Sequence, residues 1–144
     1  MSPHDPTRRR LAFTLVELLI VIIILGIIAA IVIPQFTDAA ADTKLSSMTT
    51  SLAYVRKQID IYKLQHNGGL PALATFEQQM TSRTNVDGTT GGTPNLGPYL
   101  NKLPINPFTN DDDLGAGGTG TSSWYFNDVT GEFRANCHNA HIVY

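Results

Sequence analysis

The pattern of apolar and polar positions divides the chain into a continuous apolar stretch, a one-sided stretch and a mixed C-terminal part. From Phe13 to Ile33 only Thr14, Glu17 and Gly26 interrupt the apolar side chains. At about 1.5 Å per residue, an α-helix of this length crosses the roughly 30 Å hydrocarbon core of a bilayer. The first stretch therefore predicts a transmembrane helix.

Beyond Pro34 the apolar side chains recur at alternating spacings of three and four, which is typical of one face of an amphipathic helix. This stripe consists of Leu45, Met48, Leu52, Val55, Ile59 and Tyr62. A coiled-coil seam would look similar, but it would last only about three heptads, so packing against the chain's own C-terminal part is favoured. The helix is expected to end near Asn67-Gly68-Gly69, where glycine can take a positive φ.

The C-terminal part predicts short elements separated by glycine-rich and proline-rich loops. We expect a short helix at 74–82, loops at 85–98 and 110–122, and strands at 123–127 and 132–136. The strands would form a β-hairpin with an apolar face toward the long helix. Trp124 and Phe126 are expected to share one face and Phe133 and Ala135 another, whereas Glu132 and Arg134 are expected to face water.

Composition and charge narrow the possible functions. Charged residues make up 15% of the chain and the net charge is −2, so a basic nucleic-acid-binding surface is not expected. Arg8, Arg9 and Arg10 precede the apolar stretch, which predicts a cytoplasmic N-terminus. An ordinary signal peptide is disfavoured, because its apolar region is only about 7–15 residues long. Cys137 is the sole cysteine and cannot form an internal disulfide.

Glu17 is the informative exception in the apolar stretch. A charged side chain at the centre of a bilayer costs on the order of 2.5–3.5 kcal/mol, and less near the interface. The side chain could reach the lipid headgroups, or it could serve as the partner of a cation. A plain membrane anchor would explain the length and topology of the stretch, but it would not explain this carboxylate.

The segment from Ala12 to Val21, together with the arginines before it, resembles the prepilin leader of type IV pilins and pseudopilins. The resemblance continues through Gly26 and through Ile33-Pro34-Gln35-Phe36. It implies that a membrane prepilin peptidase cuts between Ala12 and Phe13 and methylates the new amine of Phe13. Ala12 departs from the family, which usually has glycine there, so the efficiency of the cut is in question.

The same resemblance implies roles for three further residues. Glu17 would pair with the Phe13 amine of a neighbouring copy during subunit assembly. Gly26 and Pro34 match positions between which the helix is lost in related filaments, and a proline by itself already kinks a helix. Tyr99 to Phe108 resembles the Tyr-Leu-x-x-Leu-Pro-x-x-Pro-aromatic segment of major pseudopilins, which we expect to pack on the helix.

These observations predict an α+β, type IV pilin-like fold with a long N-terminal helix packed on a small antiparallel β-sheet head. The expected organisation is a leader peptide at 1–12, a transmembrane and filament-core helix at 13–34, an amphipathic helix at 35–67 and a globular head at 68–144. The chain would lie in the bacterial inner membrane as a single-pass protein. Its head would then belong to a periplasmic or cell-surface filament.

The expected function is that of a structural subunit of a type II secretion pseudopilus, which drives protein export. The alternative is a pilin of a type IV pilus for adhesion, motility or DNA uptake, and a third interpretation is an anchored binding or enzymatic domain. We find no catalytic motif and predict that the chain is not an enzyme. Expected partners are copies of itself, other pseudopilins or pilins, the prepilin peptidase, the inner-membrane assembly platform and the lipid bilayer.

Metal binding is predicted only weakly. Asp111, Asp112 and Asp113 supply oxygen ligands of the kind that calcium prefers, and major pseudopilins often bind calcium in a late loop. The spacing does not fit an EF-hand, and a solvated acidic loop is the favoured interpretation. Cys137, His138 and His141 lack a fourth ligand for a soft metal, so a mobile terminal tail is expected instead. We therefore predict no cofactor, with calcium as the minor alternative.

Overall fold

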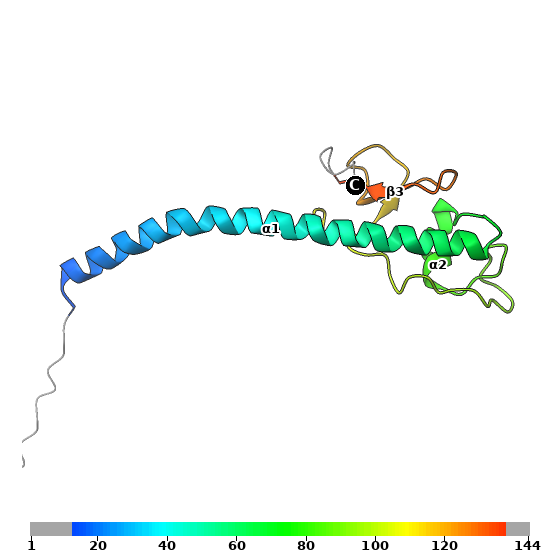
Figure 1. The fold of residues 1–144 in the computed structure, drawn as a ribbon, viewed down its shortest axis with the longest axis horizontal. Helices are drawn as coiled ribbons and strands as arrows, with labels where there is room; N and C mark the ends of the chain where they lie inside the picture. The colour runs from blue at the N-terminus through cyan, green and yellow to red at the C-terminus, as the bar shows by residue number, and fades with distance from the viewer. Residues whose placement is uncertain (1–12, 138–144) are drawn as a thin grey trace, which may run out of the picture. The chain divides into compact units, whose positions relative to one another are not determined.

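The computed structural model describes residues 13–137, without the side chains of Thr37 and Asp38. Its elements, in chain order, are α1 (Leu15–Gln65), the 3₁₀ turn η1 (Leu73–Thr75), α2 (Phe76–Thr81), β1 (Leu114–Gly115), β2 (Trp124–Phe126) and β3 (Phe133–Ala135), drawn in Figure 1. The chain forms two compact units that meet between Ala41 and Asp42, and α1 contributes residues to both. We call them the N-terminal unit and the C-terminal unit.

The N-terminal unit exposes its apolar side chains. Between Phe13 and Phe36, apart from the half-buried Val32, the large apolar side chains are exposed by 47% at Leu19 to 80% at Leu15. Among the described residues, α1 is the one helix with the length and apolar composition to cross a membrane. An apolar surface of this extent is unfavourable in water. The chain therefore carries an N-terminal membrane anchor.

The helix α1 runs without interruption across Gly26 and Pro34. A Cβ atom added to Gly26 would meet nothing within 4 Å, so this position leaves open space beside the helix. Pro34 lacks an N–H group and weakens the helical hydrogen bonding locally. The loss of helix expected between these two residues concerns the assembled filament, and it stays a prediction.

The C-terminal unit is built around the apolar stripe of α1, as the spacing predicted. Met48, Leu52, Val55, Ile59 and Tyr62 are each exposed by 3% or less. The stripe packs in one core with Phe76 and Met80 of α2, Leu100, Leu103, and the four predicted hairpin residues Trp124, Phe126, Phe133 and Ala135. Figure 1 shows β3 beside the C-terminal half of α1. Burial of this apolar surface is the main stabilising term of the unit.

The C-terminal end of α1 confirms the predicted stop signal. The helix ends at Gln65, and the N–H of Gly68 donates to the carbonyl of Lys63 at 2.8 Å. Asn67 and Gly68 have φ values of 54° and 87°. A backbone bond that spans five residues, with a left-handed residue inside it, is the Schellman closure of a helix. Asparagine, the non-glycine residue that tolerates this conformation best, takes the first left-handed position.

The hairpin prediction is confirmed for β2 and β3, which pair antiparallel with Tyr125 opposite Arg134. The prediction of an antiparallel sheet is otherwise wrong, because β1 pairs parallel to β2 and makes the three-stranded sheet mixed. This strand lies within 110–122, which we expected to be a loop. It is two residues long and leaves no alternating pattern, so the sequence gives no sign of it. Asp113 anchors it, since its carbonyl accepts the N–H of Trp124 at 3.0 Å.

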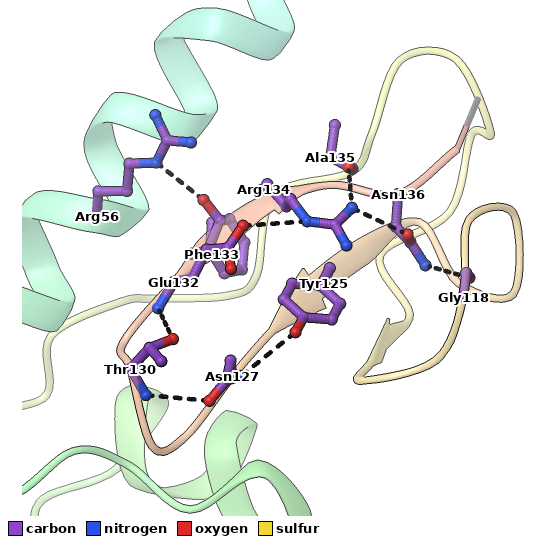
Figure 2. A network of polar contacts seen from close by, with 10 residues as sticks. All are labelled: Arg56, Gly118, Tyr125, Asn127, Thr130, Glu132, Phe133, Arg134, Ala135 and Asn136. Carbon is purple, nitrogen blue, oxygen red and sulfur yellow. Dashed lines mark hydrogen bonds and ion pairs between the residues drawn. The ribbon is translucent and has the colours of Figure 1, made fainter. Parts of the chain in front are cut away.

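The outer face of the hairpin also differs from the expectation for Arg134. Its side chain is only 18% exposed, and its guanidinium lies 3.9 Å from the centre of the Tyr125 ring. Glu132, which is 54% exposed, accepts an ion pair from Arg134 at 3.2 Å (Figure 2). Arg134 therefore covers the aromatic ring instead of extending into water, because the cation–π contact and the ion pair hold its guanidinium over Tyr125.

The aromatic core predicts a measurable difference between two hairpin positions. Phe126 is fully buried, and its ring centroid lies 4.7 Å from that of Phe76. Phe126→Ala should lower the free energy of unfolding by about 3–5 kcal/mol, because it leaves a cavity. Val129, at 85% exposure, is the control, and Val129→Ala should change stability by less than about 0.5 kcal/mol. Denaturant unfolding of the full chain in micelles tests both, and equal effects would contradict this core.

Candidate functional site

The first turn of α1 carries a reciprocal hydrogen-bonded cap between Thr14 and Glu17. The N–H of Glu17 donates to Oγ1 of Thr14 at 3.2 Å. In return, the N–H and the hydroxyl of Thr14 donate to Oε2 of Glu17 at 2.9 Å and 3.0 Å. This is a capping box, in which the residue before the helix and the third helical residue satisfy each other's backbone donors.

The cap gives Glu17 a role that the sequence analysis missed. We considered that this carboxylate reaches the lipid headgroups or pairs with a cation, but not that it caps the helix. The signal was present as Thr14 three residues before Glu17, which is the Thr-x-x-Glu pattern of a helix start. A carboxylate at this place also faces the positive end of the helix dipole. Both effects hold the side chain at the start of α1.

The cap leaves Glu17 able to accept a further donor. Both bonds from Thr14 end on Oε2, and no residue that the structure describes donates to Oε1. Phe13, directly before the cap, has a side chain that is 79% exposed. Ala12 lies outside the described residues, so the structure gives no geometry for the predicted cut. The site therefore combines an exposed Phe13 with a fixed carboxylate that has one open oxygen.

The predicted calcium candidates do not converge on a common point. Asp112 lies 2.8 Å from the ammonium of Lys102. Asp111 accepts the N–H of Asp112 at 2.8 Å, and Asp113 accepts the N–H of Ser123 at 2.7 Å. Within residues 13–137, no three acidic, histidine or cysteine side chains come together as a metal site would require. The three carboxylates as arranged do not fit a calcium ion.

The Pro-rich segment has the packing role that we predicted. Leu100 and Leu103 are buried against the stripe of α1, and the carbonyl of Pro104 accepts the indole N–H of Trp124 at 2.7 Å. Asn106, which the sequence analysis did not single out, is fully buried. Its side-chain amide donates to the carbonyl of Ser123 at 2.8 Å, and its oxygen accepts the N–H of Phe108 at 3.0 Å. The segment thus fastens the sheet to the core.

A buried histidine near the end of α1 was also missed. His66 is 5% exposed, and its ring stacks on that of Tyr62 with centroids 3.6 Å apart. Nδ1 lies 2.7 Å from the carbonyl of Tyr62, and Nε2 lies 3.0 Å from the hydroxyl of Thr84. Both ring nitrogens thus have partners, and the ring ties the loop after α2 to the helix. Its role in the described structure is to satisfy polar groups in the core.

The structure describes only part of the C-terminal segment that the sequence analysis considered as a soft-metal site, namely Cys137, His138 and His141. Cys137 is half-buried and packs against the core of the C-terminal unit. His138 and His141 lie outside the described residues, so the expected mobile tail is not tested.

Comparison with known proteins agrees with the N-terminal motif. Residues 7–33 match the family model described as the prokaryotic N-terminal methylation motif. The chain is 32% identical over 120 residues to type II secretion system core protein G of Pseudomonas aeruginosa, covering 78% of each chain. It is 29% identical over 110 residues to core protein G of Vibrio cholerae, covering 72% of this chain and 69% of that protein.

A second kind of relative is the type IV major alpha-pilin of Moraxella bovis, which is 33% identical over 105 residues, covering 73% of this chain and 63% of that protein. No solved structure matches the chain. The anchor, the methylation motif and the helix-on-sheet fold define a pilin-like membrane-anchored subunit. Within that class, the chain belongs to the family of type II secretion system core protein G.

The ion pair of Lys102 and Asp112 predicts a dependence of stability on pH. The hydrogen bond from Lys102 lowers the pKa of Asp112 and raises the pKa of Lys102. For Asp112 the stabilisation is complete above the ordinary aspartate pKa of about 3.9, and it is lost as the pH falls through the lowered value. For Lys102 it is complete below about 10.4, and it is lost as the pH rises through the raised value.

Asp112→Asn removes the contribution of this ion pair. The melting temperature of the full chain should therefore depend less steeply on pH below about pH 4 and above about pH 10. Lys102→Gln is the matched variant and should give the same profile, and the double variant should add nothing. High salt should reduce the difference from the unmodified protein, because exposed charges are screened. Additive effects of the two single variants would show that the residues titrate independently.

Proposed function

We propose that the chain is a structural subunit of a type II secretion pseudopilus and that it assembles through the start of α1. The observation that carries this proposal is Glu17, a fixed carboxylate with an open oxygen beside the first residue that the motif predicts after processing. Membership in the core protein G family supports it. The role is structural, and the C-terminal unit serves as the surface of the filament.

Assembly would follow from a change of charge. Cleavage before Phe13 leaves a positive amine at the new N-terminus, next to a helix that is already capped. The cap survives, because the N–H of Thr14 that donates to Glu17 belongs to the peptide bond with Phe13. The amine of one copy then pairs with Glu17 of its neighbour. In the low dielectric of the membrane, the two opposite charges are far more stable together than apart.

The membrane topology follows from the charges around the anchor. Arg8, Arg9 and Arg10 hold the N-terminus in the cytoplasm, so the C-terminal unit is on the outer side of the inner membrane. Proposed partners are the prepilin peptidase, which meets the segment around Ala12, and the inner-membrane platform that adds subunits to the filament. Other pseudopilins and copies of this chain supply the neighbouring anchors.

A type IV pilus is the second candidate, and the similarity to the alpha-pilin of Moraxella bovis favours it. The chain covers a smaller share of that protein than of the Pseudomonas aeruginosa core protein G. The Leu-Pro-x-x-Pro-aromatic segment, which resembles that of major pseudopilins, also favours the secretion system. The two functions differ in their genomic neighbours and in whether loss of the chain stops protein export.

Two variants of Glu17 separate its charge from its cap. Glu17→Gln keeps a capping box, because glutamine serves at this position as well as glutamate, but it removes the negative charge. Glu17→Ala removes both. Both variants should insert into the membrane, and both should lose filaments, because removal of one partner of a buried ion pair costs roughly 3–5 kcal/mol. The amount of each variant in the membrane fraction measures insertion, and the amount of filament in sheared fractions measures assembly.

Glu77→Gln is the matched control, since Glu77 is an exposed carboxylate on α2. It should leave filament yield unchanged. Normal filaments from Glu17→Gln would refute charge pairing and leave capping as the role of this residue.

Mass spectrometry of the native N-terminus tests the proposed processing. The expected mature chain begins at Phe13 with a methylated amine. Ala12→Gly should raise the processed fraction, because glycine is the usual residue before the cut. An intact Met1, or a chain that begins elsewhere, would overturn the assembly mechanism.

A further inference from the structure

Arg56 and Asp60 are two exposed, oppositely charged residues on α1 of the C-terminal unit, and neither forms an ion pair within the described residues. Arg56 and Asp60 lie on the same helix, four residues apart. Nε of Arg56 donates to the carbonyl of Phe133 in β3 at 2.8 Å. Figure 2 shows this bond, and it shows the two terminal nitrogens of the guanidinium with no contact to any other residue drawn.

The bond to Phe133 explains why Arg56 and Asp60 do not meet within one copy. Opposite charges four residues apart on a helix usually can pair. Here the guanidinium is held at the carbonyl of β3, and its two Nη groups are left to a different acceptor. An arginine oriented in this way offers a fixed pair of donors, which is the geometry that a carboxylate accepts. Arg56 is therefore a prepared carboxylate receptor on an exposed surface.

The proposed assembly identifies where a carboxylate would come from, and the inference rests on that proposal. If the Phe13 amine of one copy lies at Glu17 of the next, the two parallel copies are displaced by four residues, about 6 Å along a helix. All copies have the same fold. Wherever their helices run parallel, position 56 of the copy that offers its amine is then level with position 60 of its neighbour.

This displacement selects one pair of opposite charges. The charged side chains that the structure describes on α1 beyond Glu17 are Asp42, Lys44, Arg56, Lys57, Asp60 and Lys63. Among them, only Arg56 and Asp60 stand four positions apart with opposite signs. Lys57, the neighbour of Arg56 with the same charge, comes level with the apolar Ile61. The displacement set by Glu17 therefore matches this one pair.

We propose that Arg56 of one subunit binds Asp60 of the adjacent subunit, so that a second ion pair between copies fixes the same displacement as the pair at Glu17. The partner is a second copy of this chain. The bond from Arg56 to β3 orients the guanidinium before the subunits meet. Each subunit would contribute its Arg56 to one neighbour and its Asp60 to the other.

The test exchanges the charges in cells that assemble filaments. Asp60→Arg is the cleaner single variant, because Asp60, unlike Arg56, makes no hydrogen bond to β3. Loss of an exposed ion pair alone should reduce filament yield about two- to fivefold. Repulsion between Arg56 and the new arginine at position 60 should reduce the yield further. Arg56→Asp should do the same, and the double variant Arg56→Asp/Asp60→Arg should recover yield. Lys57→Asp, with the same change of charge one position away, should leave yield unchanged.

Folding is monitored by the melting temperature of each variant, since Arg56→Asp also removes the bond to Phe133. Recovery in the double variant cannot come from that bond, because the arginine at position 56 is absent there. No loss in Asp60→Arg, or no recovery in the double variant, would overturn the proposal. If these variants assemble normally while Glu17→Gln does not, this inference fails and the proposed function stands. If Glu17→Gln assembles normally, the proposed assembly mechanism fails with it.

Cross-linking measures the contact independently of its energy. Copies with Arg56→Cys and copies with Asp60→Cys, both with Cys137→Ala, are expressed together and treated with a short bis-maleimide. A dimer that joins one copy of each kind is expected in filaments and not in the Glu17→Ala background. Replacing Arg56→Cys by Lys57→Cys should lower its yield. Equal yields from the two combinations would contradict the predicted register.

Discussion

The structure depends on the placement of one carboxylate at the start of an apolar helix. A charge there is unfavourable unless hydrogen bonds or an opposite charge compensate it. Thr14 supplies the first compensation within the chain, through two donors on a single oxygen of Glu17. The second oxygen leaves the compensation incomplete. In the proposed assembly, a cationic neighbour would complete this compensation and make association of the anchors favourable.

The C-terminal unit solves a different problem, which is to build a core from a small number of residues. One face of α1 supplies a continuous apolar stripe, and aromatic side chains from α2, β2 and β3 cover it. Buried polar groups such as Asn106 and His66 are hydrogen-bonded, and within the described chain no buried side-chain nitrogen or oxygen lacks a partner. A core with satisfied polar groups specifies one packing arrangement. The unit therefore presents a defined surface, on which Arg56 is held in place.

The sequence predicted those features that rest on long periodic patterns. The stripe from Met48 to Tyr62 repeats often enough to identify a helix, and the shorter apolar alternation in β2 and β3, on either side of the turn at 128–131, identified the hairpin. Features that rest on a few local contacts were not predictable in this way. The strand β1 is only two residues long, and Arg134 covers Tyr125 only because the pairing of β2 with β3 places them opposite each other. The sequence analysis named Glu17 as a site residue but did not predict the geometry of the site. It gave no role to Thr14, whose hydrogen bonds hold the carboxylate.

The capping box has a consequence for the order of events in the life of the subunit. Its hydrogen bonds join atoms of Thr14 and Glu17 alone, all of which lie after the predicted cut. Removal of the leader therefore does not have to create or reshape the end of the helix. In the proposed processing, cleavage changes the charge at the start of α1 but not its conformation, because the capping box is already formed. Under the proposed mechanism, the precursor and the processed subunit would share the same helix start, and only the processed one would carry the amine that pairs with a neighbour.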